Sequence, residues 1–223
     1  MKAYAKTKPP VRKQSLREQV YEELRSRLQR GEIGHDHRLV DHSLAEELGV
    51  SRMPVREALL QLVSEGVLDS TSRGFALRRF SVDEIREVFE IRHLLEPSAA
   101  AMAARAVTSD ALKRLGEICA EARKASDAGD VRTVIVSNAA FRDEWLSLVP
   151  NAHLRQEIVR FSDYVQAVRL ATLQDKIYRE DSVRRLDSIL QAFSMRDEIR
   201  AAAAISAQLE GALGAFVAKL EQK

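Results

Sequence analysis

The chain reads Ser51-Arg52-Met53-Pro54-Val55-Arg56-Glu57-Ala58-Leu59 directly after the segment 44–50, and the two segments have the apolar spacing of two helices joined by a tight turn. Gly49 suits that turn because glycine takes positive φ without a Cβ clash. Ser51 can cap the second helix, and Pro54 falls in its first turn, where a missing N–H is tolerated.

The second helix of this pair has a buried face and a charged tip. Val55, Leu59 and Leu62 recur at spacings of four and three and share the buried face, whereas Arg52 and Arg56 share another. A helix with two arginines and a hydroxyl at its exposed N-terminal end can enter the major groove of DNA. The pattern therefore predicts a helix-turn-helix that binds DNA.

Elements on both sides complete the fold of this region. Apolar residues at spacings of four predict a first helix over residues 16–28. After the second helix of the pair, residues 67–68 and 75–77 have the composition of two short strands around a hairpin tip at 72–74. This order of elements predicts a winged helix-turn-helix domain over residues 14–79.

The hairpin tip carries Arg73 and Gly74. We expect Arg73 to lie against phosphate or in the minor groove, with Gly74 letting the backbone approach closely. An isolated arginine is most often ordinary surface charge. Here the capping residue, the proline, the paired arginines and the hairpin occur together, and the combination favours DNA binding.

Composition limits the classes of protein. The 223 residues can form two modest domains, and 45% apolar residues is ordinary for a globular chain. No apolar run approaches the roughly 18 residues that span a bilayer, and the N-terminus has no secretory pattern, so we expect no membrane association. The single cysteine, Cys119, excludes an intrachain disulfide, fits a reducing cytoplasm and reads as a small buried side chain.

Charge is divided unevenly along the chain. Residues 1–80 hold 15 Lys and Arg against 11 Asp and Glu, whereas residues 81–223 hold 20 against 22. Such a division suits a DNA-binding head on a body that does not touch DNA. Residues 1–13 hold five basic and no acidic side chains, which predicts a disordered tail that adds attraction to phosphate.

From Ser81 onward the strand signals stop. The predicted helices cover 81–106 with a kink at Pro97, 108–129, 130–148, 152–175, 178–195 and 197–221. Six helices with short connections predict an antiparallel bundle over residues 80–223. The fold class is therefore mainly α, with a winged helix-turn-helix before a helical bundle.

The first domain resembles the winged helix-turn-helix of the bacterial GntR family of transcriptional regulators over residues 14–79. The resemblance runs through Leu39, Leu44-Ala45, Leu48-Gly49-Val50-Ser51-Arg52, Pro54-Val55-Arg56-Glu57-Ala58-Leu59, Leu62, Glu65-Gly66 and Gly74. It implies operator contacts at Ser51, Arg52, Met53, Arg56, Arg73 and Gly74. The position of His42 is often an arginine that touches DNA, so histidine departs from the family pattern there.

The bundle resembles the effector domain of the FadR-type (FCD) branch of the same family. The similarity lies in Arg92-x-x-x-Glu96, Asn138-x-x-Phe141-Arg142 and Ile189-x-x-Ala192 followed by Asp197 and Ala201. With six predicted helices, the bundle resembles that of the vanillate-regulator subgroup rather than the seven-helix bundle of the fatty-acid type. The resemblance implies that the bundle binds a small-molecule effector.

The resemblance also raises the question of a metal. Many such domains hold a divalent ion through an aspartate or asparagine, a histidine four residues later and two more histidines on the last two helices. The matching positions here are Asn138, Arg142, Leu186 and Gln208. A guanidinium repels a cation and leucine has no donor atom, so we expect no metal cofactor. The loop 35–37, His-Asp-His, is interpreted as a solvated turn rather than a zinc site.

Helical periodicity places the same four positions on inward-facing stripes, where each polar group needs a partner. Two interpretations stay open. In one, Arg142 pairs with a carboxylate of the bundle while Asn138 and Gln208 bond to backbone or water. In the other, Arg142 receives an anionic ligand, a carboxylate, which Asn138 and Gln208 orient. Tyr164 and Arg160 are further candidates, although either could face solvent or a second copy of the chain.

Together the motifs indicate a ligand-responsive bacterial transcriptional regulator, a repressor by the commoner logic of the family. One winged head reads only a few base pairs, so specificity requires a homodimer on an inverted repeat of double-stranded DNA. The alternative is a constitutive DNA-binding or architectural protein without an effector. No nucleophile with a positioned base and no paired carboxylates occur at catalytic spacing, so we expect no enzyme.

Overall fold

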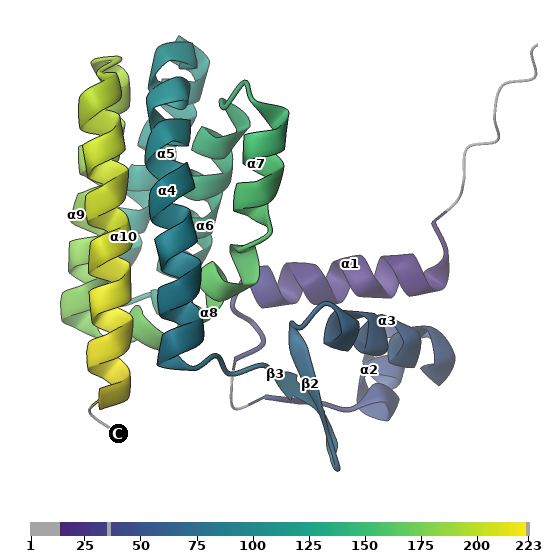
Figure 1. Cartoon of the computed structure of the whole chain (residues 1–223). Coiled ribbons are helices and arrows are strands. Elements are labelled where there is room, and N and C mark those ends of the chain that lie inside the picture. The colour runs from purple at the N-terminus through teal and green to yellow at the C-terminus, as the bar shows by residue number, and fades with distance from the viewer. Residues whose placement is uncertain (1–13, 35–36, 222–223) are drawn as a thin grey trace, which may run out of the picture. The chain divides into compact units, whose positions relative to one another are not determined.

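The computed structural model describes residues 14–34 and 37–221, which form two compact units (Figure 1). We call residues 14–26 with 37–78 the head, and residues 27–34 with 79–221 the body. The expected basic tail, residues 1–13, lies outside the described residues, as do the first two positions of the His-Asp-His loop. Each unit is described by itself.

The head contains three helices and a small antiparallel sheet. Its helices are α1 (Leu16–Gln29, whose last turn groups with the body), α2 (Asp41–Leu48) and α3 (Arg52–Ser64). Its strands are β1 (Arg38–Leu39), β2 (Leu68–Thr71) and β3 (Gly74–Leu77), in the order β1-β3-β2. The helix-turn-helix and the hairpin are confirmed. Strand β1, which pairs Leu39 with Phe75, was not predicted.

The turns of the head form where glycine occurs. Gly49 ends α2 with φ +65°, and Gly66 follows α3 with φ +75°, a region that other residues rarely adopt. Between them, α3 buries Val55, Leu59 and Leu62, as its spacing predicted. Buried apolar side chains from α1, α2 and the sheet complete a core that holds α3 in place.

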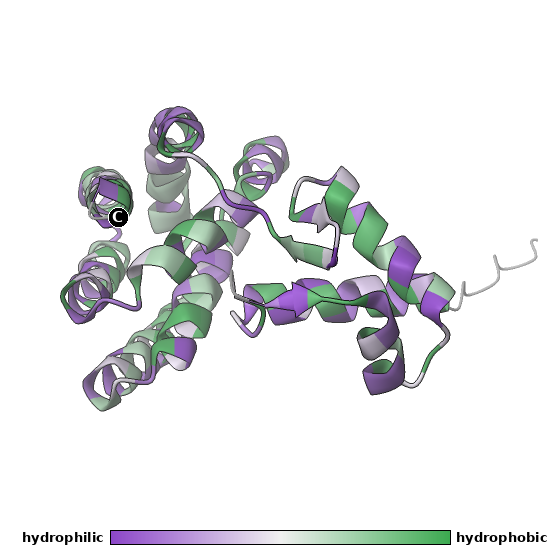
Figure 2. Cartoon of the chain, turned by 90° about the horizontal axis from the view of Figure 1, so that it is seen from below, coloured by the Kyte–Doolittle hydropathy of each residue, from purple (hydrophilic) through white to green (hydrophobic). Residues whose placement is uncertain are grey.

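The body is a bundle of seven helices within the described residues. They are α4 (Val82–Ala106), α5 (Ser109–Ala128), α6 (Val131–Ser147), α7 (Ala152–Val159), α8 (Ser162–Thr172), α9 (Lys176–Ser194) and α10 (Glu198–Glu221). Helix α10 packs on α4 and α9, and α5 packs on α6 and α9 (Figure 1). Hydrophobic and hydrophilic residues alternate around these helices (Figure 2), as expected for amphipathic bundle members.

The predicted helix 152–175 is wrong, and with it the count of six. The helix stops at Val159 and resumes at Ser162, because Phe161 leaves the helical conformation with φ −90° and ψ +8°. The carbonyl of Ile158 accepts hydrogen bonds from the Phe161 amide at 3.3 Å and from the Arg142 guanidinium at 3.2 Å. A side chain from α6 thus helps to satisfy the end of α7, a contact that local periodicity does not show.

The other helix starts agree with the sequence. Ser81 forms a capping box with Glu84, and the Thr108 hydroxyl accepts a hydrogen bond from the Ala111 amide. Pro97 lies inside α4, which continues to Ala106. Helix α4 therefore runs as one element along the bundle.

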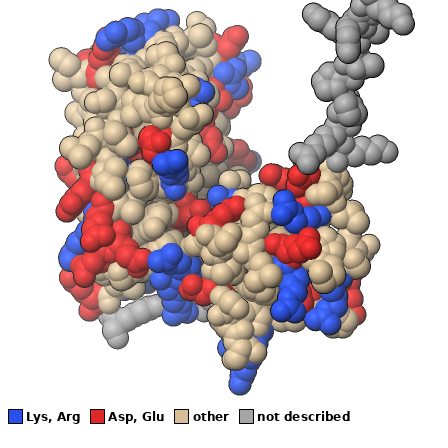
Figure 3. Space-filling view, turned by 45° about the vertical axis from the view of Figure 1, so that its right-hand side comes forward, with Lys and Arg blue, Asp and Glu red and all other residues tan. Residues whose placement is uncertain are grey.

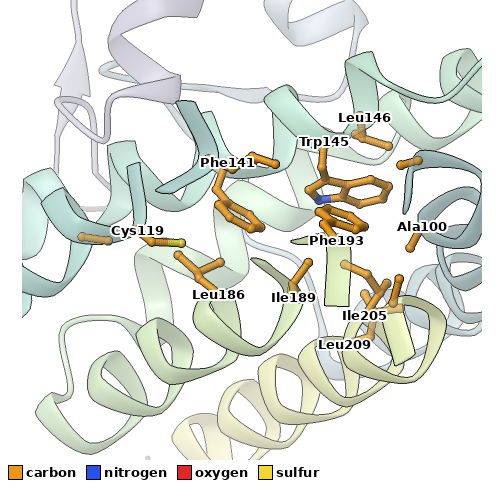
Figure 4. Packing of buried hydrophobic residues seen from close by; sticks show 14 of the residues in the cluster. Ala100, Cys119, Phe141, Trp145, Leu146, Leu186, Ile189, Phe193, Ile205 and Leu209 are labelled. Carbon is orange, nitrogen blue, oxygen red and sulfur yellow. The ribbon is translucent and has the colours of Figure 1, made fainter. Parts of the chain in front are cut away.

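The centre of the body is an apolar cluster in which aromatic rings meet aliphatic side chains (Figure 4). Trp145 of α6 and Phe193 of α9 are buried with ring centroids 6.4 Å apart. Cys119 of α5 is also buried, and burial, with a smaller contribution from the Asp187 charge, raises the pKa of its thiol to about 12. The thiol is therefore inert, as the sequence suggested.

Helix α10 differs from the expectation that no segment is long and apolar enough to span a bilayer. By length and hydropathy it is the one helix in the described part of the chain that could cross a membrane. The sequence does not show a long run of large apolar residues here, because many of the apolar residues of α10 are alanines. Because α10 packs against α4, α8 and α9 in the bundle, it is accounted for as a bundle helix.

Candidate functional site

The N-terminal end of α3 presents a group of exposed side chains. Burial of Val55 on one face of α3 leaves Arg52, Met53 and Arg56 on the outside. The side chain of Arg52 is 60% exposed, and Met53 is 63% exposed. A methionine so exposed beside two arginines offers apolar contact next to charge, which suits a surface of mixed polarity such as base edges.

Ser51 stands at the N-cap of α3, yet its hydroxyl makes no capping hydrogen bond. An N-cap oxygen accepts from the amide of the second or third helical residue, and the third residue here is Pro54, which has no N–H. The expectation that Ser51 caps α3 is therefore wrong. The exposed hydroxyl is not used in capping.

An ion pair and a histidine–glutamate contact involve the polar side chains around this tip. Asp41 of α2 accepts hydrogen bonds from Arg52 on both carboxylate oxygens at 3.1 Å, and this bonding lowers the pKa of Asp41. His42 lies 3.3 Å from Glu46 on the exposed side of α2. Arg52 is thus held across the turn, whereas Arg56 makes no hydrogen bond or ion pair with another described residue.

The hairpin tip between β2 and β3 carries a basic side chain, and Figure 3 shows Lys and Arg atoms at the tip and beside it. Arg73 is exposed, and its amide donates to the Thr71 hydroxyl at 3.3 Å. Gly74 has φ +120°, and a Cβ there would collide with the backbone oxygen of Leu39. The pairing of β1 with β3 therefore requires glycine here, independently of any contact with DNA.

The body encloses a cavity of about 80 Å³ between α4, α6, α8, α9 and α10. Asn138, Arg142, Leu186 and Gln208 all line it, so the four positions singled out in the sequence lie together. Its apolar walls include Phe141, Leu186, Ile189 and Leu209, which point towards one another in Figure 4.

Two further candidates do not line this cavity. The Tyr164 ring packs on Phe80 with ring centroids 4.3 Å apart. Arg160 is exposed at the end of α7, where it pairs with Glu157 at 3.0 Å.

A buried ionic cluster forms one wall of the cavity. Glu96 accepts from Arg92 at 2.7 Å and from Arg142 at 3.2 Å, and the three side chains are 3–8% exposed. Burial alone would raise the pKa of Glu96, but the charges of Arg92 and Arg142 outweigh it and lower the pKa to about 2. Burial also lowers the pKa of Arg92, whose guanidinium lies 4.3 Å from the Phe89 ring centroid.

Arg169 of α8 adds a third cation to this wall, and no carboxylate among the described residues pairs with it. Its guanidinium donates to the Asn138 carbonyl at 3.2 Å and to the Gln166 side chain at 3.4 Å. Burial, reinforced by the charge of Arg142, lowers the pKa of Arg169 to about 9. The charges of Asp143 and Glu96 oppose this shift but do not outweigh the effect of burial.

Polar groups on the other walls are only partly satisfied. The Asn138 amide donates to the Ser182 hydroxyl at 2.9 Å. Among the described residues, Gln208 Oε1 and Arg142 Nε are buried without a hydrogen-bond partner. An unmade hydrogen bond of a buried group costs on the order of 1–3 kcal/mol, so these atoms favour occupation of the cavity by a polar molecule.

Arg185 of α9 completes the lining. It donates to Asp181 at 2.7 Å and to the Ala207 carbonyl at 2.6 Å. The guanidinium lies flat against Gly211 of α10, where a Cβ would come within 2.6–2.8 Å of its atoms. Gly211 is thus what lets Arg185 reach the backbone of α10.

Sequence reasoning identified Arg142 but missed Arg169 and Arg185 as cavity residues. Arg169 is the single arginine of α8 and Arg185 is one of three in α9, and a charged residue on a helix gives no sign by itself of whether it faces a cavity. For Arg169 a signal was present: it follows Val165 by four residues and Val168 by one, next to the buried stripe of α8.

A divalent cation does not fit this set of side chains. The positions matching the metal ligands of similar effector domains are an asparagine, an arginine, a leucine and a glutamine, and three more arginines line the same cavity. Both carboxylates of the lining, Glu96 and Asp181, form ion pairs with guanidinium groups. The local charge favours an anion instead.

Comparison with known proteins agrees with both units. The family profile described as "Bacterial regulatory proteins, gntR family" matches residues 16–74, and the profile described as "FCD domain" matches residues 87–211. The chain is 36% identical over 129 residues to the HTH-type transcriptional regulator McbR of Escherichia coli, an alignment that spans 57% of this chain and 58% of that protein.

Two further matches extend the comparison. The chain is 38% identical over 74 residues, 33% of its length and 30% of the relative's, to the gluconate operon transcriptional repressor of Bacillus subtilis. The solved structure of E. coli McbR/YncC superposes with a TM-score of 0.81 at 24% identity, covering 93% of this chain and 100% of that one, which shows the same fold. The chain therefore belongs to the gntR family of bacterial transcriptional regulators, in the group whose second domain is an FCD effector domain.

Proposed function

We propose that this protein is a cytoplasmic repressor that binds an inverted-repeat operator as a homodimer and releases it when a small anionic metabolite, a carboxylate, enters the cavity of the body. The observation that carries the DNA-binding half is the exposed tip of α3, where Arg52 and Arg56 stand beside Ser51 and Met53. Arg73 at the hairpin tip and His42 on α2 are assigned supporting contacts to the DNA backbone. No enzymatic activity is part of the proposal.

The homodimer follows from the size of the reading surface. One recognition helix reaches only a few base pairs, which occur too often in a genome to specify a site. Two heads related by a two-fold axis read two half-sites at fixed spacing, and this symmetry requires an inverted repeat. A relative named as an operon repressor supports the choice of repression.

The effector-binding part of the proposal depends on Arg142. Asn138, Gln208 and Leu186 line the same cavity and support it. The alternative, a constitutive DNA-binding protein without an effector, has one specific observation in its favour. Arg142 already donates to Glu96, to the Ile158 carbonyl and to Ser162, as mutual satisfaction within the bundle would require. Against it stand the buried unpartnered atoms and the unpaired cation of the same cavity.

Selection of duplexes from a random pool tests the DNA-binding half. The full-length protein should enrich an inverted repeat, and its binding to that repeat should weaken steeply with salt while staying tighter than its binding to a scrambled duplex. Sedimentation of the complex should give two chains per duplex. Equal binding to every duplex at each salt concentration would contradict the proposal.

Absence of a metal is also proposed, because Arg142 and its neighbours place positive charge where similar domains hold a cation. Elemental analysis of protein purified without chelators should find well under one divalent ion per chain. The same protein dialysed against excess Zn²⁺ or Mn²⁺ and then desalted is the control for weak loading. About one retained ion per chain would overturn this part.

A further inference from the structure

The cavity lining carries more positive than negative charge. Within it lie four arginines and two carboxylates, Glu96 and Asp181. Both carboxylates already form ion pairs. Glu96 pairs with Arg92 and Arg142. Asp181 pairs with Arg185 and with Arg184, which lies outside the cavity. The lining residues thus have a formal excess of two positive charges, which the charge of Asp143, outside the lining, offsets only in part at Arg169. A buried charge without a counterion costs free energy, and a bound anion would supply that counterion.

The excess is distributed over two places rather than one. Arg92 and Arg142 share a single carboxylate on one side, and Arg142 keeps its Nε atom unpartnered. Arg169 bonds only to neutral acceptors, the Asn138 carbonyl and the Gln166 amide oxygen. Arg142 therefore keeps one unmade hydrogen bond, and Arg169 makes none to a carboxylate. One carboxylate group would neutralise only half of the excess.

Another part of the cavity lining, at Gln208, fits a ligand group of a different kind. Gln208 lines the same cavity, and its buried Oε1 atom has no hydrogen-bond donor among the described residues. A hydroxyl on the ligand can supply the missing donor. The remaining walls are apolar, and the volume of about 80 Å³ limits the ligand to a short chain.

We propose that the effector is a short dianion carrying a hydroxyl group, bound without metal, in which Arg169 is the residue that selects two negative charges over one. This proposal rests on the proposed effector function and specifies its ligand class. A hydroxylated dicarboxylate has the right chemistry, and inorganic phosphate shares the charge in a more compact form. Arg142 with Arg92 receives one charged end, Arg169 the other, and Gln208 the hydroxyl.

Calorimetric titration of the full-length protein tests this with four probes: malate, succinate, lactate and inorganic phosphate. We expect malate to bind at least about 10-fold more tightly than lactate, because one further charge-assisted pairing in a buried site is worth about one factor of ten or more. Succinate should fall between them, since it lacks the hydroxyl. Tighter binding of phosphate than of malate would assign the same dianion site to a phosphate group.

Variants at Arg169 separate charge from shape. Arg169→Gln keeps donors and most of the volume, and should weaken malate binding about 10-fold while changing lactate binding less than about threefold. Arg169→Lys should restore most of the preference for malate. Arg160→Gln, an exposed arginine outside the cavity, is the matched control and should bind like the unaltered protein.

Thermal unfolding without ligand provides a readout that does not depend on binding. Removing a partly buried cation that forms no ion pair should leave the melting temperature of Arg169→Gln unchanged or higher, so a loss of binding would not reflect misfolding. Equal affinity for malate and lactate, an unchanged ratio in Arg169→Gln, or no binding of any probe would overturn the inference. Operator selection by the same preparation is scored separately, so failure of the ligand class and failure of the regulator function are distinguished.

Discussion

Replacing Glu96 by glutamine should lower the free energy of unfolding by about 3–5 kcal/mol, because it leaves two buried guanidinium groups with no anion. Glu96 is 2% exposed and bonds to Arg92 and Arg142, which are 5% and 6% exposed. Glutamine has nearly the same shape, so the loss measures charge rather than a cavity. Chemical denaturation followed by circular dichroism gives the value.

The control is Glu90→Gln on the exposed side of the same helix, six residues earlier, which should change stability by less than about 0.5 kcal/mol. A loss in Glu96→Gln no greater than in this control would mean that the arginines find other partners. In that case the ionic cluster would not hold α4 to α6.

The same pair predicts how stability depends on pH. The folded-state pKa of Glu96, about 2, lies below its ordinary value of 4.5 because Arg92 and Arg142 outweigh the effect of burial. Its contribution is therefore fully present above about pH 4.5 and is lost as pH falls towards 2. The difference in unfolding free energy between the unaltered protein and Glu96→Gln should be constant above pH 5 and shrink below it. A difference that grew on acidification would contradict the assignment.

The double substitution Arg52→Ala with Arg56→Ala should weaken operator binding at least about 30-fold, since each arginine that reads a base edge is worth about 1–3 kcal/mol. Binding to a scrambled duplex should fall less, because only the phosphate attraction is reduced. Arg56 should account for more of the loss than Arg52, whose charge is already partly engaged by Asp41. Fluorescence anisotropy at fixed salt measures each affinity.

A matched control is Arg86→Ala, an exposed arginine of α4 in the body, which should leave operator affinity within about twofold. Thermal unfolding of the double variant should be unchanged, because neither side chain is buried. Retained preference for the operator over the scrambled duplex in the double variant would show that α3 is not the reading helix.

The head could be predicted from sequence in most of its elements. Gly49 and Gly66 mark positive-φ positions, and the spacing of Val55, Leu59 and Leu62 fixes which face of α3 is buried. These signals are local, so one sequence suffices. Strand β1 escaped because two residues are too short for a period, and its pairing with β3 depends on Gly74, far along the chain.

The body shows where local reasoning ends. The break at Phe161 is satisfied partly by Arg142, which belongs to another helix, and periodicity within 152–175 carries no trace of that contact. The cavity could be located through four inward-facing positions, but its charge could not. Only the assembled bundle shows that Arg169 bonds to neutral acceptors whereas Arg142 forms an ion pair with Glu96.

The buried state of Cys119 has a practical consequence for spectroscopy of this regulator. The Cys119 side chain, on α5, is buried, and the pKa of its thiol is raised to about 12. Maleimide and nitroxide reagents should therefore not react with it at neutral pH. A cysteine introduced on an exposed face then becomes the sole point of labelling without any other change to the chain. Spin-label separations between the two copies of the proposed dimer can then report, in one preparation, how the heads respond to each candidate ligand.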